Sequence, residues 1–242
     1  MSIYTNIARR VNGLLRRAGY KIVRAQSDFS LSAAFSRLTQ RAIPITTVID
    51  IGASNGSWSA MLYPFYPKAL YFLIEANTIH QKALEDFKRA NPSVDYIIAA
   101  AGDNEGEIFF DDRVALGGVA SQTFHEGYTR VLVTTIDALV RQHQLHPPFL
   151  IKLDTHGFEL PILNGAKETL SHTTILVIET YNFQLNAGAL RFHEMCGFLA
   201  TIGFRPIDMV DPLHRPYDQA LWQFDLIFVR ADRPEFKYAS YE

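Results

Sequence analysis

The stretch that decides the fold is VIDIGASNG, residues 48–56. It overlaps the apolar, β-branched run Thr47–Ile51, which is typical of a strand covered on both faces of a sheet. Asp50 lies near the end of this run, and Gly52 and Gly56 follow it. Because glycine allows unusual backbone conformations and close approach to a ligand, the stretch predicts a strand that breaks into a tight turn facing a ligand.

A second segment places a carboxylate at the end of the next strand. Tyr71–Ile74 is apolar, and Glu75 follows it directly. In doubly wound folds, an acidic residue about 20 residues beyond the glycine loop binds ribose hydroxyls. The two segments together therefore predict a pocket for an adenosine-like cofactor.

The glycine loop differs from two better known patterns. A dinucleotide fingerprint reads G-x-G-x-x-G, but Ser54 replaces its second glycine here. The charge of Asp50 would repel a pyrophosphate and suits a positive or zwitterionic cofactor better. Gly52–Gly56 also matches the G-x-S-x-G elbow of α/β-hydrolases, so a serine hydrolase acting through Ser54 is an alternative, although no His-Gly-Gly stretch precedes it.

Strand and helix patterns alternate along most of the chain, which predicts an α/β fold with a doubly wound, mostly parallel, seven-stranded sheet. A helix is expected after Asn77 or Thr78, with a capping box between Thr78 and Gln81, and it ends before Pro92. The expected strands are Thr47–Ile51, Ala69–Glu75, Asp95–Ala100, Phe149–Asp154 and Thr174–Glu179, followed by an antiparallel pair, Phe204–Val210 and Leu221–Val229. Glu107–Phe110 and Val131–Thr134 are expected to form an added β-hairpin.

Bulk properties limit the classes of protein that the chain can represent. The 242 residues suffice for one large domain, and a formal charge of −2 gives no general attraction to nucleic acid. The single cysteine, Cys196, excludes an intrachain disulfide and fits a reducing compartment. No apolar stretch has the length of a membrane span, and the first twenty residues lack the apolar core of a secretory signal. We therefore expect a cytoplasmic protein.

Residues 1–44 are expected to form an amphipathic helical extension to a domain comprising residues 45–242. Near the N-terminus, Ile3, Ile7 and Val11 fall on one helical face and arginines on the other. This helix either docks on the domain with its basic side in solvent or lies on anionic lipid as a peripheral membrane contact. A second helix is expected over Leu31–Gln40.

Two later clusters carry polar side chains to the same edge of the sheet. IKLDTHGFEL, residues 151–160, places Asp154 and His156 where a buried strand meets a helix. VIETYN, residues 177–182, places Glu179 near the end of the next parallel strand. Since doubly wound proteins keep their chemistry in the crevice at these strand ends, Asp154 and Glu179 are expected to face one cavity. With Asn182 they offer oxygen ligands for a divalent cation, but no metal site is assigned.

In order and spacing, these motifs resemble those of FkbM-type S-adenosylmethionine-dependent methyltransferases, which belong to the class I Rossmann-like superfamily. The resemblance covers about residues 45–230, and its motifs read VIDIGASNG, FLIEAN, AAGD, TTID, KLDTHGFE and, more loosely, VIET. Two positions depart from the family pattern. Ser54 stands where the family has Asn, and His156 stands where it has Glu before a glycine.

The resemblance implies a cofactor, S-adenosylmethionine, and assigns residues to each part of it. Glu75 would bind the ribose hydroxyls, and Asp154 would lie beneath the sulfonium. The residues implied at the methionine portion are Asp50, Gly52, Ala53 and Gly56, and Ser54 and Asn55 of the same loop are also expected to bind the cofactor. Those implied beside the ribose are Ala76 and Asn77, and those at the adenine are Ala101, Gly102 and Asp103.

The leading hypothesis is O-methylation of a hydroxyl, on a sugar, a glycan or a glycosylated metabolite. His156 is the first candidate for the general base because an imidazole titrates near neutrality, and Asp154 or Glu179 is the second, as base or as cation ligand. Aromatic residues in the C-terminal part are candidates for an acceptor wall. A serine hydrolase, a nicotinamide oxidoreductase and a non-catalytic S-adenosylmethionine-binding protein are the alternatives.

Overall fold

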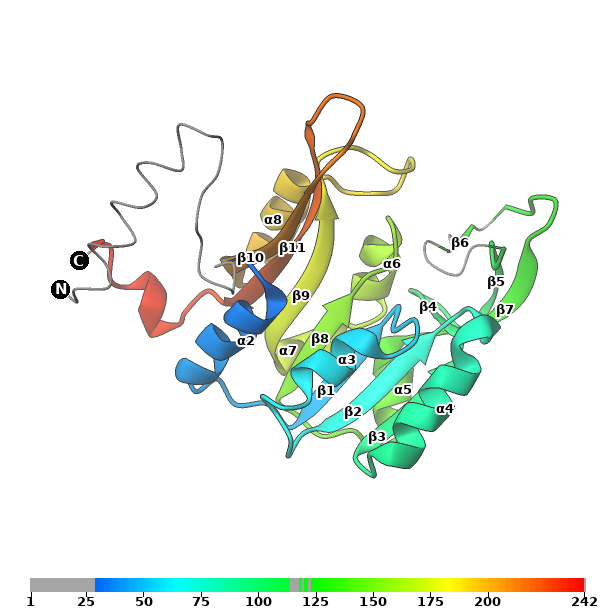
Figure 1. Cartoon of the computed structure of the whole chain (residues 1–242), viewed down its shortest axis with the longest axis horizontal. Coiled ribbons are helices and arrows are strands. Elements are labelled where there is room, and N and C mark those ends of the chain that lie inside the picture. Colours follow the sequence, from blue (N-terminus) through cyan, green and yellow to red (C-terminus); the bar gives the residue numbers. More distant parts are fainter. Residues whose placement is uncertain (1–28, 114–117, 119, 122, 242) are drawn as a thin grey trace, which may run out of the picture.

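A seven-stranded sheet forms the centre of the molecule in the computed structural model, which describes residues 29–113, 118, 120–121 and 123–241 (Figure 1). The strand order is β10-β11-β9-β8-β1-β2-β3, and β11 is antiparallel to both of its neighbours while the other pairs are parallel. This confirms the predicted doubly wound, mostly parallel sheet. The bounds are β1 (Thr47–Ile51), β2 (Leu70–Glu75), β3 (Val94–Ile98), β8 (Phe149–Leu153), β9 (Thr173–Tyr181), β10 (Phe204–His214) and β11 (Leu221–Arg230).

The interior strand β1 explains where the site lies. All five of its residues are buried, as the continuous apolar run predicts. It pairs with β2 on one side and with β8 on the other. The strands that follow β1 first extend the sheet on the β2 side, and the later strands extend it on the β8 side. In doubly wound folds, the crevice outside the strand ends at such a reversal is where ligands bind.

Helices cover both faces of the sheet (Figure 1). On one face, Val48 and Val177 pack with side chains of α2 (Leu31–Gln40), α3 (Ser57–Leu62) and α4 (Gln81–Ala90). On the other face, Ile49 and Ile178 pack with side chains of α5 (Ile136–Gln142), α6 (Glu159–Asn164), α7 (Lys167–Ser171) and α8 (Phe192–Thr201). Successive strand residues thus feed two separate apolar cores, as a period of two requires.

The added hairpin belongs to a second, smaller sheet of order β4-β7-β5-β6 beside the β3 edge (Figure 1). As predicted, β5 (Gly106–Phe110) and β7 (Thr129–Thr134) pair antiparallel. The strand expected over Asp95–Ala100 is divided between the sheets: β3 ends at Ile98, whereas β4 (Ala100–Ala101) pairs with β7. A further short strand, β6 (Ala120–Ser121), pairs with β5.

The helix after β2 begins differently from the expected capping box. The Asn77 side chain accepts a hydrogen bond from the Ile79 amide at 3.1 Å and caps a 3₁₀ turn, η2 (Thr78–His80). The α-helix α4 then starts at Gln81. A capping box needs its Glu or Gln at the third helical position, so Gln81 cannot form the expected box with Thr78. The helix ends at Ala90, before Pro92 as expected. A last 3₁₀ turn, η3 (Pro234–Phe236), follows the sheet.

The helix expected over Leu31–Gln40 is confirmed as α2, and it packs on the core. The Phe35 ring meets the Trp58 ring edge-on at 5.5 Å, and the Arg37 guanidinium binds both carboxylate oxygens of Asp208. The predicted amphipathic helix nearer the N-terminus lies outside the described residues. Within the described ranges, no helix is both long enough and apolar enough to cross a membrane.

Candidate active site

A cavity of about 310 Å³ opens at the carboxyl ends of β1, β2 and β8, where the strand order predicts a ligand site. Its size is at the lower end of the range typical of small-molecule pockets. Among the residues expected at the site, the cavity lining includes Gly52, Ser54, Glu75, Ala76, Asn77, Ala101, Asp154, His156 and Glu179. The predicted crevice therefore brings together residues from five strand ends, those of β1, β2, β4, β8 and β9.

The glycine loop needs its first glycine for a steric reason. Gly52 has a φ of +71°, and a Cβ built there would lie 2.0 Å from the carbonyl oxygen of Asp154. No other residue fits so close to the neighbouring strand end. Ser54 also has a positive φ, +50°, which turns its backbone amide toward the tip of β2.

Glu75 is held as an acceptor at the tip of β2. Its Oε2 accepts the backbone amide of Ser54 at 2.6 Å, and its Oε1 accepts the amide of Asn77 at 2.7 Å. Each carboxylate oxygen has a second lone pair, so two acceptor positions remain for hydroxyl groups in the cavity that Glu75 lines. This geometry fits the predicted contact with a ribose diol.

Asp50 lies beneath the loop, and the residues that line the described cavity do not include it. It is fully buried, its Oδ2 accepts a 2.6 Å hydrogen bond from Ser59 Oγ, and its Oδ1 lies 3.2 Å from the ammonium of Lys152. Lys152 also donates to the Gly52 carbonyl at 2.9 Å and lies 3.3 Å from Asp154 Oδ2. The structure thus places Asp50 in a buried ion pair that supports the loop, and a direct contact with a cofactor stays a prediction.

The remaining expected cofactor residues divide between wall and scaffold. Ala53 and Gly56 are buried behind the loop, while Asn55 is exposed and its side-chain oxygen accepts a hydrogen bond from the Ser57 amide. Gly102 and Asp103 follow the cavity wall without lining it. Sequence reasoning missed an apolar part of the wall that comes from both sheets: Ile51, Ile74, Ala99, Ala100, Phe110, Gly118, Ala120 and Phe158. This apolar surface suits a nucleobase.

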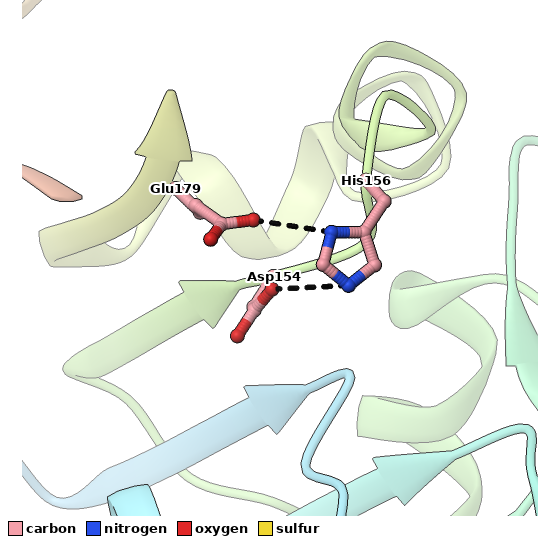
Figure 2. Close-up of side chains that lie close together, drawn as sticks. All are labelled: Asp154, His156 and Glu179. Atoms are coloured by element: carbon pink, nitrogen blue, oxygen red, sulfur yellow. Dashed lines mark ion pairs between the residues drawn. The ribbon is translucent and has the colours of Figure 1, made fainter. Parts of the chain in front are cut away.

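Three titratable side chains that line the cavity, Asp154, His156 and Glu179, lie close together (Figure 2). The His156 ring lies between two carboxylates, with Nδ1 3.3 Å from Glu179 Oε2 and Nε2 3.9 Å from Asp154 Oδ1. His156 has a φ of +51° and Gly157 one of +95°, so the loop turns sharply in the left-handed region. Strain of this kind gathers at functional sites, and here it directs the imidazole into the cavity.

Neighbouring groups fix the His156 loop and its partners. Glu159, which is buried, accepts hydrogen bonds from the Thr155 hydroxyl at 3.1 Å and from the Gly157 amide at 3.0 Å. Tyr181 donates its hydroxyl to Glu179 Oε2, and the same hydroxyl oxygen lies 2.8 Å from His156 Nδ1. Gln223 on β11 donates its amide to Glu179 Oε1. Sequence reasoning missed Gln223 as a partner of Glu179 because its proximity depends on the register of β9 with β11. It also missed Tyr181, which the spacing of two residues along one strand could have indicated.

The charges shift the titration of these groups in different directions. The hydrogen bond to Glu179 raises the pKa of His156 above its ordinary value, and the Asp154 charge adds to this against the effect of burial. Burial alone would raise the pKa of Asp154, but Lys152 and His156 lower it, so Asp154 stays ionised. Burial, together with the charges of Asp154 and Glu179, raises the pKa of Asp225 to about 7. Such pairs of shifted groups are typical of catalytic sites.

The expected cation ligands are only partly brought together. Asp154, His156 and Glu179 each offer one ligand atom, and these atoms lie within 4.8 Å of one another. Asn182 instead donates its side-chain amide to the Leu221 carbonyl at 3.2 Å. Both Glu179 oxygens and His156 Nδ1 have protein partners within the site, and a divalent cation stays a prediction.

A continuous series of aromatic side chains begins at Tyr181, which contacts His156 at the cavity. The Tyr181 ring meets Trp222 edge-on at 6.0 Å, Trp222 stacks on Phe183 at 5.3 Å, and the Arg215 guanidinium covers Phe183 at 4.1 Å. At the end of this series, Tyr217 is 90% exposed. The series joins the loop after β9 to the β10–β11 hairpin next to His156.

Comparison with known proteins identifies a related family. The family model for the methyltransferase FkbM domain matches residues 50–206. Among curated proteins, none matches the sequence significantly.

Solved structures with a similar chain fold are distant in sequence. They include a precorrin-6y C5,15-methyltransferase from Geobacter metallireducens, with 13% identity over 83% of this chain and 87% of that chain and a TM-score of 0.44. A putative O-methyltransferase from Klebsiella pneumoniae has 16% identity over 93% and 90% of the two chains and a TM-score of 0.48. The fibrillarin pre-rRNA processing protein from Methanococcus jannaschii has 13% identity over 78% and 68%, with a TM-score of 0.49.

The serine hydrolase alternative is not supported. Ser54 Oγ does lie 3.3 Å from His80 Nε2, but the family match assigns the loop that carries Ser54 to a methyltransferase domain. Ser54 and His80 both line the cavity.

Proposed function

The chain belongs to the FkbM methyltransferase family and is an S-adenosylmethionine-dependent methyltransferase, and from this premise we propose that it methylates a hydroxyl group of a sugar or glycosylated acceptor. The single observation that carries the proposal is the position of His156. Its imidazole lines the cavity and lies between the carboxylates of Asp154 and Glu179. A hydroxyl acceptor needs a general base to take its proton. An amine or thiol acceptor depends less on such a base.

The cavity residues fit the methyl donor. Glu75 offers two acceptor positions for the ribose hydroxyls, the alanine-rich wall with Phe110 and Phe158 suits the adenine, and Asp154 provides a negative charge beside the sulfonium. When bound, S-adenosylmethionine supplies a methyl group whose carbon bonds to the acceptor oxygen while the carbon–sulfur electron pair stays on sulfur. Correct alignment of such reactants supplies about 7–11 kcal/mol of the barrier reduction.

His156 performs the proton transfer in this proposal. As oxygen bonds to the methyl group, its hydroxyl proton passes to the imidazole, which then carries a positive charge. The carboxylates of Asp154 and Glu179 on either side stabilise that charge. A positioned general base contributes about 10²–10⁴-fold in rate. This is the role that we assign to the histidine in place of the family's usual glutamate.

The aromatic series supports a sugar acceptor. Trp222 and Phe183 lie in the loop and hairpin that border the His156 end of the site, and Tyr217 extends the series into solvent. Apolar ring surfaces flanked by polar groups such as Arg215 are suited to the mixed apolar and hydroxyl faces of a pyranose.

The test has two steps. Calorimetric titration with S-adenosylhomocysteine first measures cofactor binding, and transfer of a labelled methyl group to a panel of sugar, phenol, amine and thiol acceptors then measures the reaction. His156→Ala is expected to keep cofactor affinity and to lower turnover about 10²–10⁴-fold. His172→Ala, at an exposed position near α7, is the matched control and should turn over normally. Normal turnover by the His156 variant, or transfer only to amines or thiols, would contradict the proposal.

A further inference from the structure

The direction of each hydrogen bond around Glu179 can be worked out from the number of protons available. The side-chain nitrogen of Gln223 can only donate, and it donates to Glu179 Oε1. The Tyr181 hydroxyl donates to Glu179 Oε2. Burial and the charge of Glu179 raise the pKa of Tyr181 above its ordinary value, so this hydroxyl keeps its proton. Both oxygens of Glu179 are therefore acceptors.

This arrangement determines which nitrogen of His156 carries the proton. Tyr181 has one hydroxyl proton, and it is used on Glu179, so the Tyr181 oxygen can only accept from His156 Nδ1 at 2.8 Å. The other neighbour of Nδ1, Glu179 Oε2 at 3.3 Å, is also an acceptor, whereas the carboxylate beside Nε2, Asp154 Oδ1, lies at 3.9 Å, beyond hydrogen-bond distance. Both partners require a proton on Nδ1, and in the neutral ring Nε2 then has a lone pair.

We propose that Gln223, Glu179 and Tyr181 form a proton-ordering chain that holds neutral His156 in its Nδ1–H tautomer, with Nε2 free to take the acceptor's proton. The catalytic part of this inference rests on the proposed function, in which His156 is the base. Gln223, Glu179 and Tyr181 act through His156 and are positioning residues. We call Gln223, Glu179, Tyr181 and His156 the proton-ordering chain below.

The backbone keeps this chain of hydrogen bonds in place. Tyr181 and Gln223 are directly opposite each other in the β9–β11 ladder, and Glu179 lies two residues from Tyr181 on the same face of β9. Tyr181 is 5% exposed and Glu179 8% exposed, so water competes little for their hydrogen bonds. Only His156 comes from a loop, and Glu159 anchors that loop.

An isosteric substitution should reverse the order of protons. In Glu179→Gln, Gln223 still donates to the Oε1 position, so the oxygen of the new amide must lie there and its nitrogen must lie at the Oε2 position. That nitrogen donates to the Tyr181 oxygen, whose proton then turns to His156 Nδ1. His156 would adopt the Nε2–H tautomer, which has no lone pair toward the cavity.

A second substitution should restore the original order. In the double variant Glu179→Gln/Gln223→Glu, the carboxylate introduced at position 223 can only accept, so the amide at position 179 turns over and donates to it. The amide oxygen then faces Tyr181, which donates to it and accepts from His156 Nδ1–H. The double variant also restores the net charge of the wild-type pair, with the carboxylate now on β11 instead of β9.

The experiment reads the tautomer directly and turnover separately. Histidine labelled with ¹⁵N and ¹³C is incorporated, the His156 resonances are assigned by their loss in His156→Gln, and spectra are recorded with S-adenosylhomocysteine bound, at a pH where the ring is neutral. Glu168→Gln, an exposed glutamate-to-glutamine change on α7, is the matched control. Circular dichroism and S-adenosylhomocysteine affinity establish that each variant is folded.

The inference predicts that His156 is in the Nδ1–H tautomer in the wild type and in the control. In Glu179→Gln, it predicts the Nε2–H tautomer and a turnover about 10²–10⁴-fold lower. In the double variant, it predicts that the Nδ1–H tautomer returns and that most of the turnover is regained. An Nε2–H wild type overturns it without any variant, and so does an unchanged tautomer in folded Glu179→Gln. The proposed function fails separately: an Nδ1–H wild type whose His156→Ala variant turns over normally leaves the proton-ordering chain intact but removes His156 from catalysis.

Discussion

Replacing Lys152 by Met tests whether the buried ion pair beneath the glycine loop supports the fold. The Lys152 ammonium is 2.9 Å from the Gly52 carbonyl, 3.2 Å from Asp50 and 3.3 Å from Asp154, and the residue is 4% exposed. Burial disfavours its charged form, but the carboxylates of Asp50 and Asp154 outweigh this and raise the pKa of Lys152, so it stays charged. Methionine keeps a similar length without the charge.

The expected loss is set mainly by Asp50. Asp50 is 0% exposed, so removing Lys152 leaves a buried carboxylate whose other side-chain partner is the Ser59 hydroxyl. Removing one partner of a buried pair costs about 3–5 kcal/mol. Asp154, whose side chain is 36% exposed, adds little because solvent screens it. At an m-value of about 3 kcal/mol/M, the urea midpoint should fall by roughly 1–2 M.

Urea unfolding followed by far-UV circular dichroism measures this change. Lys88→Met is the matched control, since Lys88 pairs with Asp95 at the surface with both side chains about half exposed and should cost about 0–1 kcal/mol. Asp50→Asn/Lys152→Met removes both charges and should recover most of the loss. The reasoning is refuted if Lys152→Met costs no more than the Lys88 control, or if the double variant is no more stable than the single one.

Three further predictions concern the cofactor and the base. Gly52→Ala should weaken S-adenosylhomocysteine binding about tenfold or more in calorimetry, because its Cβ would meet the Asp154 carbonyl at 2.0 Å and its φ is +71°; unchanged affinity would contradict the loop geometry. Glu75→Gln should weaken S-adenosylhomocysteine binding by about 1.5–3 kcal/mol, because the new side-chain nitrogen would face the backbone amide of either Ser54 or Asn77. An unchanged affinity would argue against Glu75 as the ribose acceptor. Because the pKa of His156 is raised, the active basic form appears only above pH 6.5, and kcat/KM should rise with a midpoint above that value; a midpoint below it would contradict the assignment.

Most of the fold could be predicted from sequence because the strands that matter are buried on both faces. Such strands are continuous apolar runs, and Thr47–Ile51 was predicted with its observed bounds. The end of β3 was not, because Ala100 leaves one sheet and joins another, and an alanine run carries no signal for that change.

The site was predictable where function follows directly from a strand end, and not where it depends on tertiary contacts. Glu75, Asp154 and Glu179 lie at such ends and line the cavity as expected. Asp50 also lies near the end of a strand, but its side chain forms an ion pair with Lys152 on the neighbouring strand. This pairing depends on the register of β1 with β8, which places the two residues side by side. Phe110 and Gln223 reach the site only through sheet pairing, which spacing along the chain does not reveal.

The antiparallel insertion of β11 between β9 and β10 has a consequence for how this enzyme can diversify. It places Gln223 on a rigid ladder beside Tyr181, whereas the loop after β9 and the β10–β11 hairpin, which carry Phe183 and Arg215, extend beyond that ladder. Substitutions or insertions in those outer segments can alter which molecule is accepted while leaving the deprotonation apparatus untouched. On the proposed function, selectivity and chemistry would reside on separately mutable parts of one sheet edge, so relatives with new acceptors should differ first in those two segments.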